Sequence, residues 1–130
     1  MNKLLITLLL LISSGSAFAE MTKVGESPNG IQTYYIDYQT AKKSGGLIKV
    51  WTLFDYKKPQ RIGSQNLYLS VLSQKEFNCK EELFRNLAAS FFSENMRDGE
   101  IISSLKIPTA WEPVPPESVI KLITENICKR

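Results

Sequence analysis

The 130-residue chain carries 16 basic and 13 acidic residues, no histidine and two cysteines, which gives a formal net charge of +3. The positive charge is weak and scattered, so the sequence does not indicate a nucleic-acid partner. Without histidine the chain lacks the commonest general acid–base group and metal ligand, and it contains no Gly-rich phosphate loop or Gly-x-Ser-x-Gly turn. We therefore expect a protein that is not an enzyme and has no cofactor or metal.

Residues 1–19 have the three parts of a secretory signal peptide. Lys3 gives a positive start, an apolar run extends from Leu4 to Ile12, and the segment ends in Ala17-Phe18-Ala19. The apolar run is shorter than the roughly 20 residues that a membrane-spanning helix needs. We expect cleavage between Ala19 and Glu20. A lipoprotein would carry Cys in place of Glu20, so we predict an exported protein, periplasmic or secreted, with no lipid anchor and no integral membrane segment.

The first half of the mature chain predicts three strands. Residues 20–30 are polar, so we expect a flexible N-terminal lead-in before a single domain over 31–130. Residues rich in β-formers fill 31–38 and 47–56, with turn residues at 42–46 between them. A polar loop from Lys57 to about Gly63 precedes a third strand over 67–79. In the second strand, alternate residues form an apolar face that we place on the core: Ile48, Val50, Thr52, Phe54 and Tyr56.

The segment from Lys80 to Glu94 is ambiguous. Leu83, Leu87 and Phe91 recur every four residues, as do Phe84, Ala88 and Phe92, which favours a helix. The large aromatic residues favour a strand, as does the hairpin-like turn that follows at 95–99. Residues 100–105 then predict a further strand. Periodicity alone leaves both structures open for the segment.

The C-terminal region predicts a helix that a disulfide ties to the sheet. A proline-rich stretch surrounds Trp111, and Pro116 is suited to the first turn of a helix, with Glu117 complementing its dipole. An apolar stripe at helical spacing leads to Cys128. Two cysteines in a small exported domain most simply form a disulfide, and the one intramolecular pairing is Cys79 with Cys128.

Several short motifs occur in a fixed order along the mature chain. They are Tyr34-Tyr35-Ile36-Asp37, Val50-Trp51, Asn78-Cys79, Gly99-Glu100, Trp111 followed by prolines, and a last helix ending in Ile127-Cys128. Together they resemble the surface-adhesin protein E family over about Ile31 to Cys128. The resemblance implies an α+β fold, with an antiparallel β-sheet of about five to six strands and a C-terminal α-helix packed on it and tied by one disulfide. It also implies that the chain continues as a strand over 81–92.

The same resemblance implies a binding function. The family includes a lipid-anchored adhesin that binds vitronectin, laminin and plasminogen, largely through a region that matches Leu67 to Phe91 here. Within that region Lys75, Lys80 and Arg85 are candidate contacts, with solvated surface residues as the alternative. The present sequence departs from the adhesin because it lacks the lipid-anchor Cys, which weakens the inference of adhesion.

Three further candidates lie in the densest basic stretch, Lys57, Lys58 and Arg61, which is either a solvated hairpin loop or a contact for an acidic ligand. We expect Trp51 to pack in the sheet and Trp111 to cover the sheet edge or the helix start, with partner contact as the alternative for each. The sequence therefore predicts a non-catalytic exported binding domain whose partner is a host matrix protein or an envelope protein. The alternative is a soluble periplasmic structural or accessory protein without a host ligand, forming a homodimer through an open sheet edge.

Overall fold

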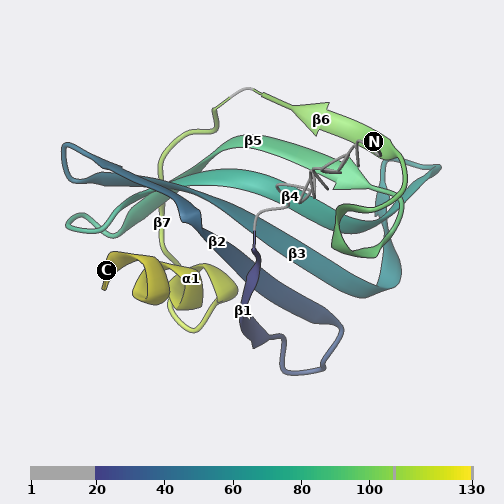
Figure 1. Ribbon diagram of the computed structural model, residues 1–130, viewed down its shortest axis with the longest axis horizontal. Coiled ribbons are helices and arrows are strands. Elements are labelled where there is room, and N and C mark those ends of the chain that lie inside the picture. Colours follow the sequence, from purple (N-terminus) through teal and green to yellow (C-terminus); the bar gives the residue numbers. More distant parts are fainter. Residues whose placement is uncertain (1–19, 107, 130) are drawn as a thin grey trace, which may run out of the picture.

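A computed structural model describes residues 20–106 and 108–129, which form one antiparallel sheet and one C-terminal helix (Figure 1). The predicted signal peptide lies outside the described residues, so the signal and its cleavage stay predictions. The elements are β1 (Thr22–Glu26), β2 (Gln32–Ser44), β3 (Leu47–Ile62), β4 (Asn66–Asn78), β5 (Leu83–Phe92), the 3-10 turn η1 (Asn95–Arg97), β6 (Ile101–Leu105), β7 (Glu112–Pro113) and α1 (Val119–Cys128).

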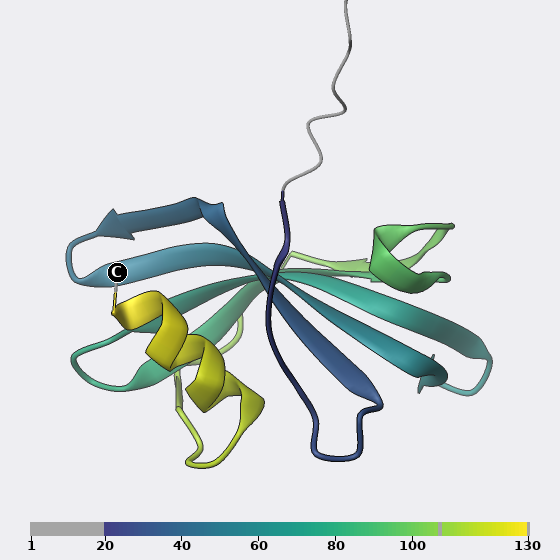
Figure 2. The same cartoon turned by 60° about the horizontal axis from the view of Figure 1, so that its bottom comes forward.

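The strands lie in the sheet in their order along the chain, from β1 to β6, and the short β7 pairs with β5. Every pairing is antiparallel, which short hairpin turns permit. The predicted antiparallel sheet with one C-terminal helix is confirmed, although the described residues form seven strands rather than five to six and are mostly β. Figure 2 shows that the sheet is strongly twisted and that α1 lies across one half of a single face.

Strand β1 lies inside the stretch 20–30 that we expected to be a flexible lead-in. It pairs with β2, with Lys23 opposite Tyr35 and Glu26 opposite Thr33. Because this pairing uses backbone groups and most β1 side chains are exposed, the strand carries no apolar alternation that would reveal it in the sequence. Gly25 lets the helix come close, since a Cβ there would lie 2.5 Å from Leu122 Cδ2.

The turn between β2 and β3 is shorter than predicted. β2 continues to Ser44, so that Gly45 and Gly46 alone form the turn in place of the stretch 42–46. Both glycines have positive φ, 57° and 81°. Two such residues in a row give a hairpin turn whose twist matches that of the strands.

Strand β3 continues to Ile62, so the polar loop predicted from Lys57 is part of a strand. A bulge between Asp55 and Gln60 interrupts the pairing with β4. Pro59 lies within this bulge, where its missing N–H leaves no ladder bond unmade. Exposed charged residues and a proline made this end of β3 look like a loop in the sequence.

Strand β5 confirms the strand that the family resemblance implied for 81–92. It pairs along β4, with Phe84 opposite Phe77 and Phe91 opposite Val71, and its other edge pairs with β6. Non-local pairing on both edges outweighs the local helical spacing, as is common for strands. The turn η1 then reverses the chain, which confirms the turn predicted at 95–99.

The hydrophobic core lies between α1 and the half of the sheet that the helix covers. Sheet residues and helix residues in this core are at most 7% exposed. Burial of large apolar side chains at about 25 cal/mol per Å² makes this cluster the main source of stability. The buried members are Ile36, Ile48, Val50, Phe77, Phe84, Ile123 and Ile127.

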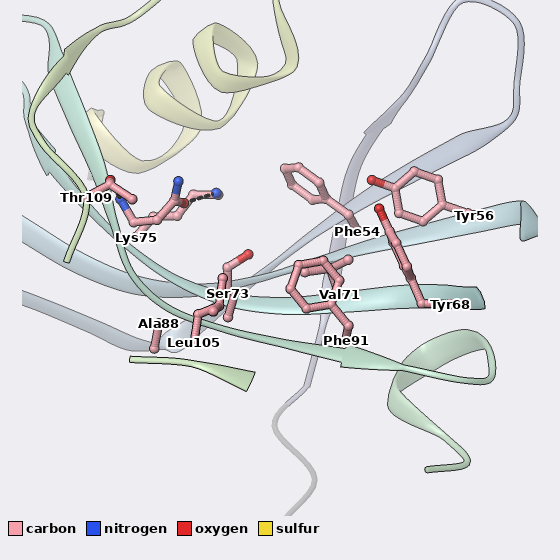
Figure 3. Close-up of a pocket in the computed structure, with 12 residues that line it drawn as sticks. Phe54, Tyr56, Tyr68, Val71, Ser73, Lys75, Ala88, Phe91, Leu105 and Thr109 are labelled. Atoms are coloured by element: carbon pink, nitrogen blue, oxygen red, sulfur yellow. Dashed lines mark hydrogen bonds between the residues drawn. The ribbon is translucent and has the colours of Figure 1, made fainter. Parts of the chain in front are cut away.

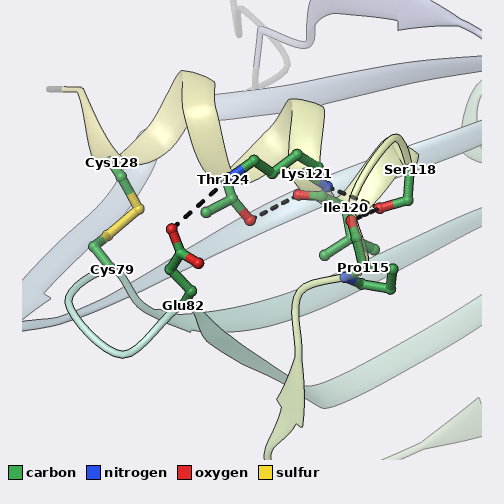
Figure 4. Close-up of polar contacts among 8 residues, drawn as sticks. All are labelled: Cys79, Glu82, Pro115, Ser118, Ile120, Lys121, Thr124 and Cys128. Atoms are coloured by element: carbon green, nitrogen blue, oxygen red, sulfur yellow. Dashed lines mark hydrogen bonds and ion pairs between the residues drawn. A yellow bond between two sulfur atoms is a disulfide. The ribbon is translucent and has the colours of Figure 1, made fainter.

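Helix α1 begins three residues after Pro116, the residue at which we predicted its start. Ser118 is the N-cap, and its Oγ accepts a hydrogen bond from the backbone N–H of Lys121 at 3.1 Å (Figure 4). Glu117 has a φ of 53°, which excludes it from the helix and from its first turn. A capping serine thus sets the helix start, and the prolines only lead the chain to it.

The predicted disulfide between Cys79 and Cys128 is present, with an S–S distance of 2.05 Å (Figure 4). It joins the chain just beyond β4 to the last residue of α1. The two residues are 49 positions apart, so the bond closes a long loop and restricts the unfolded chain.

Candidate functional site

A cavity of about 290 Å³ lies on the half of the sheet face that α1 leaves open (Figure 3). Its lining comes from β3, β4, β5 and β6 and from Thr109 in the loop before β7. Apolar and aromatic side chains dominate this lining: Phe54, Tyr56, Tyr68, Val71, Phe91 and Leu105. A mostly apolar concavity with few polar groups is the usual form of a small-molecule site.

The covered core and the open cavity share one face because β3 runs through both. Ile48 and Val50 pack under the helix, whereas Phe54 and Tyr56, further along the same alternation, line the cavity. The predicted core face of this strand is confirmed by the burial of four of its five residues. Phe54 is only partly buried, because the open cavity lies in front of it.

Contacts between aromatic rings build the wall of the cavity. Tyr68 makes edge-to-face contacts with Tyr56 and Phe91, at centroid distances of 5.8 and 5.0 Å. Phe54 makes a third such contact with Tyr34, at 5.1 Å. Edge-to-face pairs are favourable beyond the area they bury, so these rings hold one another in place.

Lys75 is a buried cation at the other end of the cavity and is only 5% exposed. Its Nζ donates a hydrogen bond to Asn86 Oδ1 and lies 5.2 Å from the ring centroid of Phe54. No carboxylate among the described residues forms an ion pair with it. Desolvation without a counter-charge lowers the pKa of Lys75 to about 8. The ammonium group is therefore still largely protonated at pH 7.

The loop before β7 fixes the position of Asn86. The backbone N–H of Asn86 donates to Thr109 Oγ1 at 3.0 Å, and the backbone N–H of Thr109 donates to Asn86 O at 2.8 Å. These two bonds anchor the loop to β5 and hold the Asn86 amide against Lys75.

The two tyrosines of the cavity are neutral at physiological pH. Desolvation raises the pKa of Tyr56 to about 12 and also raises the pKa of Tyr68. None of the described lining residues is acidic, so the ammonium of Lys75 is the one charge among them. The cavity combines an apolar wall with a single buried positive charge.

The basic stretch Lys57, Lys58 and Arg61 is exposed in the part of β3 at and beyond the bulge. Arg61 Nη1 donates to the backbone oxygen of Ser64 at 3.3 Å. None of the three forms an ion pair with a carboxylate in the described part of the chain. The structure therefore brings these predicted residues together as a solvent-facing basic segment.

Arg85 and Trp111 lie together on the sheet face opposite the cavity. Arg85 Nη2 lies 2.6 Å from Glu76 Oε1, and the side chain of Glu76 is only 4% exposed. The Arg85 guanidinium also stacks 4.6 Å from the ring of Trp111, and Lys49 Nζ lies 4.0 Å from Glu76 Oε2. Both candidates thus have structural contacts, since Arg85 neutralises the buried carboxylate of Glu76 and Trp111 stacks on the Arg85 guanidinium.

The remaining candidates lie elsewhere. Lys80 is exposed in the turn between Cys79 and β5. Trp51 is partly buried on the face away from the helix, where it borders a small cavity with Leu72 and Asp37. The predicted binding residues therefore occupy separate places: the basic segment, the open cavity, the opposite face and the turn after Cys79.

The sequence nominated Lys75 as either a partner contact or a solvated surface residue, and it did not point to the residues around it. Asn86, Thr109 and Tyr68 were not singled out, because their contacts join segments that are distant in sequence. One signal was available. Val71, Ser73, Lys75 and Phe77 alternate along β4, so a lysine stands in a row of core-facing positions.

Neither a metal centre nor a membrane-spanning helix is found in the part of the chain that the structure describes. Its Asp, Glu and Cys residues form no cluster of three or more that could hold a metal ion. No helix formed by residues 20–106 and 108–129 is long and apolar enough to cross a membrane.

Comparisons with known proteins identify the fold and the family. Solved structures of protein E from Haemophilus influenzae share the fold. The structure from crystal form II is 16% identical in sequence and has a TM-score of 0.64. The match covers 82% of this chain and 87% of the protein E chain. A second structure of protein E is 17% identical and has a TM-score of 0.58. This match covers 74% of the present chain and 76% of the protein E chain. No curated protein sequence matches the chain significantly. The family model of surface-adhesin protein E matches residues 21–129. The chain therefore belongs to the surface-adhesin protein E family.

Proposed function

We propose that this protein is a non-catalytic binding domain that acts outside the cytoplasm and recognises a macromolecular partner. The partner is an extracellular-matrix protein or a protein of the cell envelope. Membership in the surface-adhesin protein E family over residues 21–129 is the observation that carries this proposal. The predicted signal over residues 1–19 supports an extracytoplasmic location.

The basic segment formed by Lys57, Lys58 and Arg61 is the surface that we propose for the partner. Its side chains are exposed and form no ion pair with a described carboxylate, so their charge is available to an acidic partner. Arg85 and Trp111 are poorer candidates, because a partner would have to compete with the contact of Arg85 to the buried Glu76.

The test is a titration of the immobilised mature domain with vitronectin, laminin and a panel of purified envelope proteins at physiological salt. Saturable binding that is weakened by charge reversal of the basic segment would support the proposal. The variant is Lys57→Glu with Lys58→Glu and Arg61→Glu. Removing exposed charges at the edge of an interface mainly lowers the association rate constant and its dependence on salt concentration. The association rate is therefore the most sensitive measurement.

The matched control reverses three other exposed lysines, Lys42→Glu with Lys106→Glu and Lys129→Glu. It changes the net charge by the same amount and leaves the basic segment intact. Equal loss of binding in both variants would show that binding depends on the net charge of the protein and not on the basic segment. No binding above nonspecific levels for any partner in the panel would overturn the proposal.

A second candidate function is an accessory protein of the periplasm that forms a homodimer without a host ligand. The open edge strand β6 favours it, because Ile101 and Leu105 there are 61% and 56% exposed. Sedimentation velocity of the mature domain tests this candidate against the variant Ile101→Lys. A concentration-dependent dimer that the variant abolishes, together with periplasmic retention on cell fractionation, would favour it over surface binding.

A further inference from the structure

We propose that the cavity beside Lys75 binds an apolar carboxylate, an unbranched acyl chain that ends in a carboxylate group. This small-molecule site shares no lining residue with the basic segment and does not depend on a macromolecular partner. The cavity lies between the positive charge of Lys75 and the aromatic wall of Tyr56, Tyr68 and Phe91 (Figure 3).

The head group of the ligand follows from the donors of Lys75. An ammonium group has three N–H donors, and the described residues supply one acceptor, the amide oxygen of Asn86. The charge has no counter-ion within the described structure, and it lies at the cavity rather than on the surface. A carboxylate would provide both the missing acceptors and the missing charge, because charge-assisted hydrogen bonds are strongest where water is excluded.

The body of the ligand follows from the lining. Beyond Lys75 the wall consists of aromatic and aliphatic side chains from four strands, including Phe54, Val71 and Leu105. The volume of about 290 Å³ is near the lower end of the roughly 300–1,000 Å³ typical of small-molecule sites. A single acyl chain of moderate length fits such a space, whereas the bulk of a folded partner does not.

The lysine is costly to the free protein, which is a further reason to assign it a ligand. Its lowered pKa means that the folded protein binds the proton of Lys75 less tightly than the unfolded chain does, although the ammonium form still predominates at pH 7. A methionine would fill the same place without a charge. A titratable group with a pKa perturbed by burial in a cavity is typical of functional sites.

The groups that face Lys75 leave a bound anion unopposed. Asn86 on β5 and Thr109 on the loop before β7 are neutral, and Ser73, on the same strand as Lys75, is uncharged. Tyr56 on β3 and Tyr68 on β4 have raised pKa values and stay neutral up to strongly alkaline pH. No carboxylate among the described lining residues would repel the ligand.

The experiment is a titration of the mature protein with decanoate, decanol and decylamine, followed by isotope-edited NMR and calorimetry. Decanoate and decylamine are kept below their micelle concentrations, and decanol is kept below its solubility limit. We expect decanoate to bind more tightly than decanol, and decylamine not to bind. The shift changes should centre on Val71, Phe91 and Leu105, which line the cavity. At pH 8 binding should take up roughly half a proton per ligand, seen as a dependence of the heat on buffer, because the carboxylate raises the pKa of Lys75.

Two variants distinguish the charge from the wall. Lys75→Met should lower decanoate affinity about 10- to 100-fold, as expected for a lost charge-assisted bond, and leave decanol affinity unchanged. Phe91→Ala should weaken decanoate and decanol alike, by about two- to tenfold. Lys80→Met removes an exposed lysine as a matched control and should change neither affinity.

The proposal is overturned if decanoate binds Lys75→Met as tightly as it binds the unmodified protein. It is also overturned if decylamine binds as well as decanoate, or if no shift change occurs at the cavity at any soluble concentration. A two-dimensional NMR spectrum of each variant establishes that it is folded. Because the basic segment plays no part here, these outcomes do not depend on whether the protein binds a macromolecular partner.

Discussion

The two halves of one sheet face differ in whether the helix α1 covers them. In the covered half, Ile48, Val50 and Phe77 pack under Ile123 and Ile127 of α1 and are almost completely buried. In the open half, the same strands continue with aromatic residues and Lys75, and α1 does not extend over them (Figure 2). The covered half supplies the hydrophobic core that stabilises the fold. The open half contains a cavity and the buried charge of Lys75, whose desolvation destabilises the folded protein. The residues that stabilise the fold and the proposed binding cavity are thus separated along the length of the same strands.

The largest expected effect comes from removing the covalent tie of the covered half. The double variant Cys79→Ser with Cys128→Ser should lower the free energy of unfolding by about 4 kcal/mol, because a long loop is released in the unfolded chain. Urea denaturation followed by circular dichroism measures this loss. Adding reductant to the unmodified protein should reproduce it. A midpoint that neither treatment changes would show that the tie contributes nothing.

A matched pair of truncations compares the halves directly. Ile123→Ala in the covered core should cost about 2–5 kcal/mol, since the residue is fully buried and its loss leaves a cavity. Leu105→Ala at the open half should stay within about 0.5 kcal/mol, because the residue is 56% exposed. Thermal and chemical denaturation of both variants give these values. Similar losses at the two sites would contradict the division into halves.

Lys75→Met should stabilise the protein at pH 7, by about 1–3 kcal/mol. The pKa of Lys75 is lowered from 10.5 to about 8, so between these pH values the unfolded chain binds more protons than the folded one. The free energy of unfolding should therefore rise as pH increases through this window. Denaturation at pH 7 and pH 10 measures the slope, which the variant should lose. A variant that is less stable at pH 7 would mean that Lys75 contributes favourable packing that outweighs its desolvation.

The smallest effect at neutral pH is expected for Tyr56→Phe. The pKa of Tyr56 is raised from 10 to about 12, so both states are neutral at pH 7 and stability should change by less than about 1 kcal/mol. Between pH 10 and 12 the unfolded chain loses the phenol proton first, so stability falls as pH rises. The variant should reduce this alkaline loss in a pH series of unfolding midpoints. If the unfolding midpoints of the variant fell with pH as those of the unmodified protein do, the loss of stability at alkaline pH would be due to groups other than Tyr56.

The sequence predicted most of the sheet because its strands alternate or carry aromatic residues. It predicted the apolar face of β3, the position of β4 and the pairing of Cys79 with Cys128. It missed β1 and the far end of β3, since edge pairing and bulges depend on backbone groups that leave no apolar pattern. The strand β5 needed the family resemblance, because local spacing favoured a helix.

The candidate site was less predictable than the fold. Alternation places Ile48 and Phe54 on the same face of β3, but it cannot show where the helix ends and the open half begins. That boundary depends on where α1 lies across the sheet, which is a tertiary feature. The burial of Lys75 depends on it as well, because Asn86 and Thr109 come from later segments of the chain. Sequence could therefore nominate Lys75 but not its surroundings.

The approach of α1 to β1 at Gly25 has a consequence for the order of folding. The hairpins from β1 to β6 can form one after another, because each strand pairs with its neighbour in the chain. The helix, in contrast, packs Leu122 against Gly25, so the last element of the chain rests on the first strand. A chain that emerges from its N-terminus would keep Ile36, Ile48 and Val50 in water until its final residues arrive. During that interval the half of the sheet that later becomes the core is the half most exposed to aggregation or to a chaperone.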